Sequence, residues 1–88
     1  MYFPRLRDLR EDEDLKQKDI ADILRISQQH YSQYERGERE LPMSFFIILA
    51  KKYKVSLDYI AGLTNDKRGI GYDSKYNIAN YGNININE

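Results

Sequence analysis

The clearest alternation of apolar and polar residues lies in the segment 17–39. Its first part places Ile20, Ala21 and Leu24 on one side of a helix, because these positions follow the 3.6-residue helical period. Ser27 follows shortly after, and a serine there can cap a second helix because its hydroxyl accepts a hydrogen bond from a free backbone N–H. The pattern therefore predicts two short helices joined by a tight turn.

The second of these helices has two unlike faces. Tyr31 and Tyr34 centre the side that faces the core when residues are placed at intervals of about 100°. The opposite side carries amide, hydroxyl and guanidinium groups, which belong to Gln28, Gln29, Ser32, Gln33 and Arg36. Glutamine can pair with the N6 and N7 edge of adenine in the major groove. This arrangement is typical of a helix-turn-helix that reads duplex DNA, although an ordinary solvated helix face has the same residue types.

Weaker apolar patterns predict three further helices. Residues 5–13 carry Leu6 and Leu9 three positions apart, and residues 43–54 and 55–62 also place apolar side chains at helical spacing. The expected core of these last two helices consists of Met43, Phe46, Ile47, Ala50, Tyr53, Leu57, Ile60 and Leu63. The fold class is therefore predicted to be all-α, a compact bundle of about five short helices.

Two features are candidates for a dimer contact. Phe45 and Ile48 lie on a helix face outside the predicted core stripe, and an exposed apolar pair suggests a contact surface. The segment 65–88 is rich in Asn and Gly, which favour turns or disorder. Its apolar residues nevertheless alternate with polar ones, as in an extended edge strand that could pair with another chain. These residues are Tyr76, Ile78, Ile84 and Ile86.

We therefore predict a helix-turn-helix domain over residues 1–64 and an Asn-rich tail over residues 65–88. A dimerising tail and a flexible tail both remain open at this point.

Charge argues against a strong DNA binder. The 88 residues contain 14 basic and 14 acidic side chains, and residues 1–63 contain 11 of each. Neutralising phosphates supplies much of the affinity of nucleic-acid binders, so a neutral chain predicts reduced affinity. The four adjacent acids at 11–14 are expected in a loop, whereas Arg25, Arg36 and Arg39 flank the second helix.

Composition also bounds the chemistry. The chain has no cysteine and one histidine, which leaves no thiolate metal site and no metal site built from histidines. The run of acids is typical of a solvated turn, and no catalytic triad spacing or Gly-rich phosphate loop occurs, so we expect no enzyme activity, metal or cofactor. The N-terminus has no apolar leader and no run is long enough to span a membrane, which predicts a soluble, cytoplasmic protein.

Taken in order, these residues resemble the Cro and lambda-repressor type of helix-turn-helix domain, the Xre-like family. The likeness covers about residues 5–64 without gaps. Its most specific parts are Leu15-x-Gln17-x-x-Ile20-Ala21-x-x-Leu24-x-Ile26-Ser27, Tyr31-Ser32-x-Tyr34-Glu35-x-Gly37-x-Arg39-x-x-Pro42 and Leu49-Ala50-x-x-Tyr53-x-Val55-Ser56-x-Asp58-Tyr59-x-x-Gly62-Leu63.

The resemblance implies a transcriptional regulator, most simply a repressor, that binds a near-palindromic operator in double-stranded DNA as a homodimer. The expected base contacts are Ser27, Gln28, Gln29, Ser32 and Gln33, and the expected phosphate contacts are Gln17, Lys18, Arg36 and Arg39. In the family, the counterparts of Arg10 and Glu35 form a structural ion pair. His30 is expected to serve in packing rather than in base reading.

Two positions depart from the family pattern. Lys16 stands where a Thr or Ser cap is usual, and Arg25 stands where Gly is usual, so each weakens a helix end by about 1 kcal/mol. We hypothesise that Arg25 instead offers charge near the DNA backbone.

Two alternative functions stay open. One is an antitoxin whose tail binds a toxin protein. The other is a helix-turn-helix module used only for protein contact, which the zero net charge supports.

Overall fold

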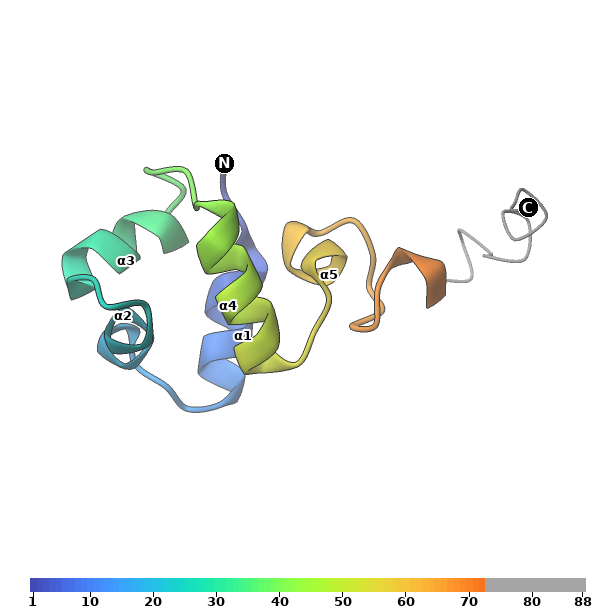
Figure 1. Cartoon of the computed structure of the whole chain (residues 1–88), viewed down its shortest axis with the longest axis horizontal. Coiled ribbons are helices and arrows are strands. Elements are labelled where there is room, and N and C mark those ends of the chain that lie inside the picture. The colour runs from blue at the N-terminus through green and yellow to red at the C-terminus, as the bar shows by residue number, and fades with distance from the viewer. Residues whose placement is uncertain (73–88) are drawn as a thin grey trace.

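The computed structural model of the chain describes residues 1–72 (Figure 1). The elements follow in the order α1 (Pro4–Asp12), α2 (Gln17–Leu24), α3 (Gln28–Glu35), α4 (Met43–Tyr53), α5 (Leu57–Ala61) and the short 3-10 helix η1 (Ile70–Tyr72). Residues 1–72 contain no strand, which confirms the predicted all-α bundle of about five short helices. The predicted strand residues Tyr76, Ile78, Ile84 and Ile86 lie outside the described residues.

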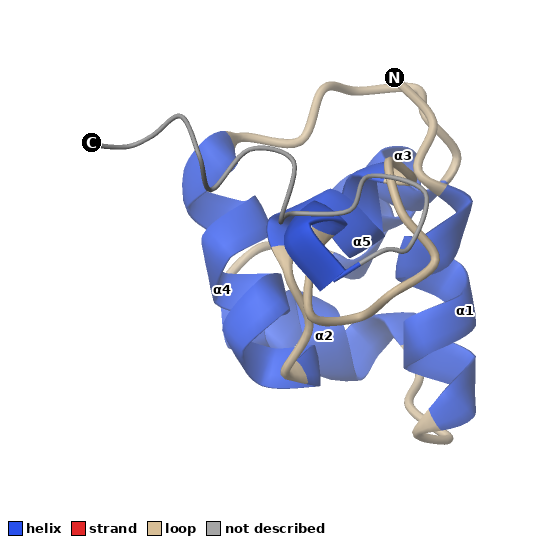
Figure 2. Ribbon diagram, turned by 90° about the vertical axis from the view of Figure 1, so that its right-hand side faces the viewer, coloured by secondary structure: helices blue, strands red, loops and turns tan. Residues whose placement is uncertain are grey.

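The helices divide into three zones along the long axis. Figure 1 shows α2 and α3 at one end, α1 and α4 in the middle, and α5 with η1 at the other end. Viewed from that last end, α5 lies in front, with α4 on one side and α1 on the other (Figure 2). The central helix α1 contacts both α3 and α5. The helix pair α2 and α3 thus forms an outer face that the rest of the bundle supports.

The core draws on every α-helix. Its most deeply buried large side chains are Leu6, Ile20, Tyr31, Leu49 and Ile60, one from each helix in turn. The apolar stripe predicted for the first helix of the pair is buried, as are both tyrosines of the second. Burial of such side chains is the main favourable term in folding, so this core fixes where α2 and α3 lie.

The predicted core stripe of α4 was partly wrong. Met43 and Ile47 are 62% and 41% exposed, whereas Leu49, which the prediction left out, is fully buried. The buried arc runs through Phe46, Leu49, Ala50 and Tyr53. Because α4 is apolar almost all round, its period is compatible with either stripe, and packing against the neighbouring helices decides between them.

The core expected from α5 is also smaller than predicted. Ile60 is buried, but Leu57 and Leu63 are 37% and 56% exposed. A helix of only five residues makes little more than one turn, so it turns few side chains toward the core. The acidic run is likewise not wholly a loop, because α1 continues to Asp12.

Arg5 ties α5 to the start of α1. Its Nη1 donates to the carbonyl oxygens of Tyr59, at 2.7 Å, and of Thr64. Its guanidinium also lies 4.0 Å from the centre of the Tyr59 ring. The chain after Leu63 stays close to α5, since the backbone N–H of Ser56 donates to the carbonyl of Lys67 at 2.7 Å. No helix among residues 1–72 has the length and apolar character needed to cross a bilayer.

Candidate nucleic-acid interface

The turn between α2 and α3 forms as the sequence suggested. Arg25 ends α2 in the left-handed conformation, with φ 59° and ψ 44°. The Ser27 hydroxyl caps α3 by accepting from the backbone N–H of His30 at 3.0 Å. Lys16 lacks the hydroxyl of the usual Thr or Ser cap. The start of α2 is instead stabilised by Asp19, whose carboxylate accepts from the Lys16 backbone N–H at 2.8 Å.

Gly37 ends α3. The backbone N–H of Glu38 donates to the carbonyl of Gln33 at 2.9 Å, and Gly37 takes the left-handed conformation with φ 75°. The backbone of Tyr2 packs directly on this glycine, so that a Cβ atom at position 37 would lie 3.0 Å from the Tyr2 Cα and 2.9 Å from its Cβ. The N-terminal segment therefore lies against the end of α3.

A buried ion pair fixes α3 to α1. Arg10 Nε lies 2.6 Å from Glu35 Oε2, and Arg10 Nη2 lies 3.2 Å from Oε1. The Arg10 guanidinium also donates to the Leu15 carbonyl at 2.8 Å, and Gln17 Nε2 donates to Glu35 Oε1 at 3.1 Å. Helices α1 and α2 thus both contact the Glu35 carboxylate at the end of α3. The resemblance implied the contact of Arg10 with Glu35 but not that of Gln17.

The environment of Glu35 stabilises its charged form. Burial of the Glu35 carboxyl opposes its ionisation, but the hydrogen bonds from Arg10 and Gln17 outweigh burial and keep the pKa of Glu35 below its usual value. Burial raises the pKa of the neighbouring Tyr31 hydroxyl far above its usual range, and the Glu35 charge adds to this effect. The carboxylate is therefore a fixed negative charge that orients α3.

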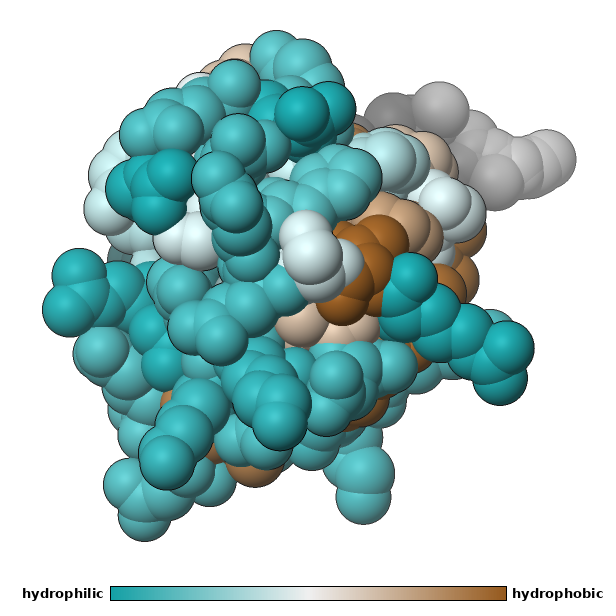
Figure 3. Space-filling view, turned by 90° about the vertical axis from the view of Figure 1, so that its left-hand side faces the viewer, coloured by the Kyte–Doolittle hydropathy of each residue, from teal (hydrophilic) through white to brown (hydrophobic). Residues whose placement is uncertain are grey.

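A groove of about 380 Å³ runs between the start of α2 and α3. It is lined by Gln17, Gln28, Gln29, Ser32 and Arg36. Figure 3 shows that this end of the molecule is almost entirely hydrophilic, with a small apolar area at its centre. The described residues therefore gather most of the predicted base-contacting side chains at one polar surface.

The five candidate base contacts differ in their freedom. Gln28 and Gln29 are exposed and make no side-chain hydrogen bond within residues 1–72. Ser27 is exposed but its hydroxyl is used as the cap of α3. Ser32 is only 9% exposed and forms the floor of the groove, while Gln33 accepts from Arg39 at 2.9 Å. The two free amides are therefore the most accessible groups.

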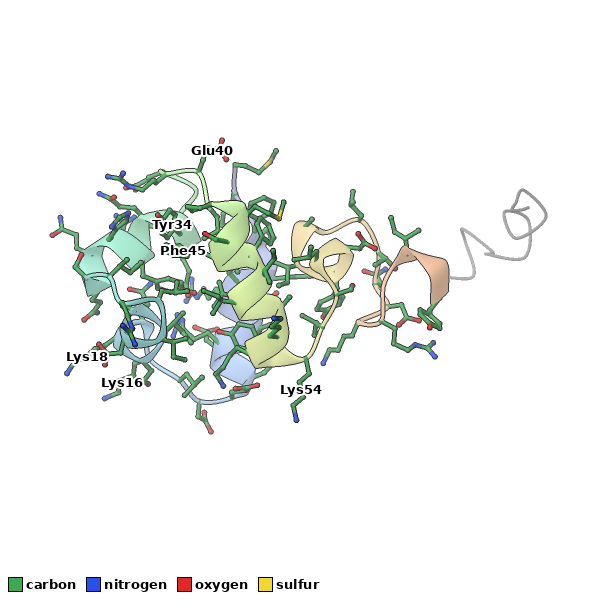
Figure 4. All side chains as sticks on the ribbon, viewed as in Figure 1. Lys16, Lys18, Tyr34, Glu40, Phe45 and Lys54 are labelled. Atoms are coloured by element: carbon green, nitrogen blue, oxygen red, sulfur yellow. The ribbon has the colours of Figure 1, made fainter. Side chains whose placement is uncertain are left out.

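The four candidate phosphate contacts are mostly engaged inside the chain. Gln17 donates to Glu35, and Arg39 donates to Gln33. Arg36 donates to Glu38 through Nε at 2.7 Å and through Nη2 at 3.0 Å. Only Lys18 is without a side-chain partner among the described residues, and Figure 4 shows it projecting away from the bundle beside Lys16.

His30 and Phe45 both contact Tyr34, His30 within α3 and Phe45 from α4. The Tyr34 hydroxyl and His30 Nε2 lie 3.0 Å apart. Phe45 packs edge-on against the Tyr34 ring, with the ring centres 5.9 Å apart, and Figure 4 shows the two side chains together between α3 and α4. Phe45 is therefore half-buried rather than part of a fully exposed apolar pair, while Ile48 is 39% exposed.

Sequence reasoning missed Glu38 as a member of this surface. Its carboxylate binds Arg36 with both oxygens, and the hydrogen bonds from Arg36 hold the pKa of Glu38 below its usual value. The charge pattern Arg-Gly-Glu at 36–38 was the available signal, since a turn at glycine can bring the flanking charges together.

Comparison with known proteins agrees with this geometry. The profile of the family described as Helix-turn-helix matches residues 6–60, more than half of the chain. The chain therefore belongs to the helix-turn-helix family of the Cro and lambda-repressor type, as the sequence resemblance indicated.

Two curated relatives come from Bacillus subtilis (strain 168). One is the uncharacterized HTH-type transcriptional regulator YobD, 41% identical over 66 residues that make up 75% of this chain and 59% of the relative. The other is the uncharacterized HTH-type transcriptional regulator YqaE, 35% identical over 68 residues, 76% of this chain and 59% of the relative. The chain thus spans about three fifths of either relative. No solved structure matches it.

Proposed function

We propose that this chain is a transcription regulator that binds duplex DNA through α3 and represses by occupying its site in the cytoplasm. The observation that carries the proposal is the polar groove between α2 and α3, where Gln28 and Gln29 are exposed and unpaired among the described residues. A free glutamine amide can pair with both the N6 and N7 groups of adenine. The names of the two relatives, both HTH-type transcriptional regulators, support the same class.

The support behind the groove fits this role. A reading helix must be held in place to distinguish bases, since misplacement by about an ångström weakens bidentate pairs. The ion pair of Arg10 with Glu35 and the hydrogen bond of Gln17 join α1, α2 and α3 directly beneath the groove. We expect this cluster to keep α3 in register while the amides pair with bases.

The balanced charge fits a binder of modest affinity. Two acids at the far end of α1 are neutralised inside the chain, because Glu11 lies 3.0 Å from Arg7 and Glu13 lies 2.8 Å from Lys52. The exposed Lys18 on α2 and Arg25 at its end have no side-chain partner among the described residues and remain available. Because each phosphate contact contributes about 0.9 to the slope of log affinity against log salt, few contacts predict an affinity that declines only slowly with salt.

We further propose that the working unit is a homodimer, and we place its contact on α4 and α5. The exposed apolar side chains Met43 and Leu57 line a hollow of about 330 Å³ together with Phe3 and Phe46, and Ile47 is a further exposed apolar residue of α4. A second copy would cover this apolar face. It lies away from the α2 and α3 end, so two copies could present both reading helices to one duplex (Figure 1).

The dimer is tested by the oligomeric state of Leu57→Lys. This change adds a charge to the apolar face and should shift the protein from dimer to monomer in light scattering. Ile23→Lys is the matched control, because Ile23 is similarly exposed but lies on α2. Equal behaviour of wild type and Leu57→Lys would exclude this face from the contact.

DNA binding is tested by selection from a random duplex library at two salt concentrations. Wild type should enrich a two-fold symmetric site, and Gln29→Ala should weaken binding to it by about 1–3 kcal/mol and relax one base position. Ser44→Ala, an exposed polar change on α4, is the control and should leave the selected site intact. Failure of wild type to enrich any sequence at low salt would refute the proposal.

A further inference from the structure

Arg36 has an unusual number of hydrogen bonds for an exposed arginine. Its Nε and Nη2 donate to the two oxygens of Glu38, at 2.7 Å and 3.0 Å, and its Nη1 donates to the hydroxyl of Ser32. The Arg36 and Glu38 side chains are 50% and 54% exposed, so this small network lies at the surface and is open to a ligand.

Counting donors shows what the network leaves free. A guanidinium has five N–H groups, one on Nε and two on each terminal nitrogen. Glu38 takes one from Nε and one from Nη2, and Ser32 takes one from Nη1. One N–H therefore remains on each terminal nitrogen. When the Ser32 hydroxyl takes the N–H of Nη1 on the Cδ side, the two remaining N–H groups lie side by side at the end of the guanidinium. They then form the fork that pairs with O6 and N7 of guanine in the major groove.

The position of the guanidinium favours a base over a phosphate. Ser32 lies one helical turn before Arg36 and forms part of the groove floor, so its hydrogen bond draws the guanidinium back along α3. Arg36 consequently lines the same groove as Gln28 and Gln29. These two residues provide the free amides of the surface.

The charge of the network points the same way. Glu38 cancels the positive charge of Arg36 at close range, which makes the pair a poor neutraliser of a phosphate. A phosphate placed on this guanidinium would also meet the Glu38 carboxylate. Guanine presents uncharged acceptors instead, which a nearby carboxylate repels much less than it repels a phosphate.

We propose that Arg36 reads one guanine in each half-site, and that Glu38 and Ser32 are positioning residues which aim its free fork into the groove. This replaces the expectation of a phosphate contact at Arg36. The inference rests on the proposed DNA-binding function. It adds guanine to the bases that the site recognises, beside the adenine expected for the glutamines.

The test uses the full chain and the operator selected by wild type, with each position of the half-site varied. Arg36→Met keeps a long side chain but has no hydrogen-bond donor for a base. It should lose the preference for guanine at one position by roughly 5- to 150-fold. A phosphate contact carries no base preference, so an unchanged preference at every position of the half-site in Arg36→Met would overturn the assignment.

Salt dependence gives a second, independent readout. The double variant Arg36→Ala with Glu38→Ala removes the network without changing the net charge. It should lose the guanine preference while the slope of log affinity against log salt stays the same. A slope that falls by about 0.9 would identify a lost phosphate contact and overturn the proposal.

Glu38→Gln tests the positioning role. It should weaken the guanine preference without lowering affinity for unrelated DNA, because it removes a negative charge from the interface. Glu40→Gln is the matched control, since it removes the same charge from the same loop without touching Arg36. Equal base preference in these two variants would show that Glu38 does not orient Arg36. If wild type selects no sequence at all, the DNA-binding function itself fails.

Discussion

Two arginine–glutamate pairs involve α3, and they have almost the same geometry in opposite surroundings. In the pair of Arg10 with Glu35 the closest N···O distance is 2.6 Å, and the two side chains are 11% and 4% exposed. In the pair of Arg36 with Glu38 the distance is 2.7 Å, but the exposures are 50% and 54%. Both are guanidinium–carboxylate pairs, and they differ in their exposure to water.

That difference assigns the two pairs to different tasks. A buried charge that loses its partner cannot turn to water, so breaking a buried pair is costly, whereas an exposed pair exchanges its partner for water at little cost. The buried pair of Arg10 with Glu35, the inner pair, can therefore hold α3 in place, and the exposed pair of Arg36 with Glu38 is the outer pair. The outer pair can aim a side chain and still yield to DNA.

The strongest test of this contrast is Glu35→Ala. It leaves the Arg10 guanidinium buried without its main partner, so we expect the free energy of unfolding to fall by about 3–5 kcal/mol. Urea unfolding followed by circular dichroism measures this. A loss no larger than that of Glu38→Ala would mean that burial does not separate the two pairs.

The second largest effect is expected from acid, which should reduce the stability that the inner pair contributes. Because the pKa of Glu35 is depressed in the folded state, its stabilising contribution is complete above the unfolded value of about 4.3 and is lost as pH falls through the lower folded value. Wild type should therefore lose stability below about pH 4. Glu35→Gln should start less stable at pH 7 and depend less on acid, and parallel curves for the two proteins would contradict the assignment.

A smaller effect is expected at the turn that separates the two helices of the pair. Arg25 is in the left-handed conformation, which glycine adopts without strain, so Arg25→Gly should raise the free energy of unfolding by up to about 1 kcal/mol. Thermal unfolding measures the gain. If Arg25 lies near the phosphate backbone of DNA, the affinity of Arg25→Gly for DNA should fall at the same time. An unchanged affinity would refute that hypothesis.

The smallest effect on stability is expected for the outer pair itself. Glu38→Gln should leave the melting temperature unchanged within error, because the Arg36 guanidinium can be hydrated at this exposed position. Differential scanning calorimetry measures this by comparing the melting temperatures of wild type, Glu38→Gln and the control Glu40→Gln. A clear destabilisation by Glu38→Gln alone would make the outer pair a structural element and remove the contrast.

Sequence reasoning succeeded where short-range chemistry decides the structure. The stripe of Ile20, Ala21 and Leu24 and the Ser27 cap located α2 and α3, because period and capping act within a few residues. The pairing of Arg10 with Glu35 joins residues far apart in the chain. Only the family resemblance could suggest it.

The remaining features depend on packing between distant segments. The buried arc of α4 could not be chosen from its sequence, because the helix offers apolar residues on most sides and Leu49 competes with Ile47. The engagement of Arg36 by Glu38 depends on the turn at Gly37, which places two exposed side chains together. Composition gives no sign of which partner an exposed arginine chooses.

The contact between Gly37 and the backbone of Tyr2 makes the N-terminal segment a useful place for a reporter. Tyr2 is 59% exposed and lines a cavity of about 460 Å³ together with Gln17 and Arg36, two residues that also line the groove. An environment-sensitive dye attached to the variant Tyr2→Cys would lie in this cavity, beside two residues of the groove. Its fluorescence would turn occupancy of the groove into an optical signal, with no label on the DNA.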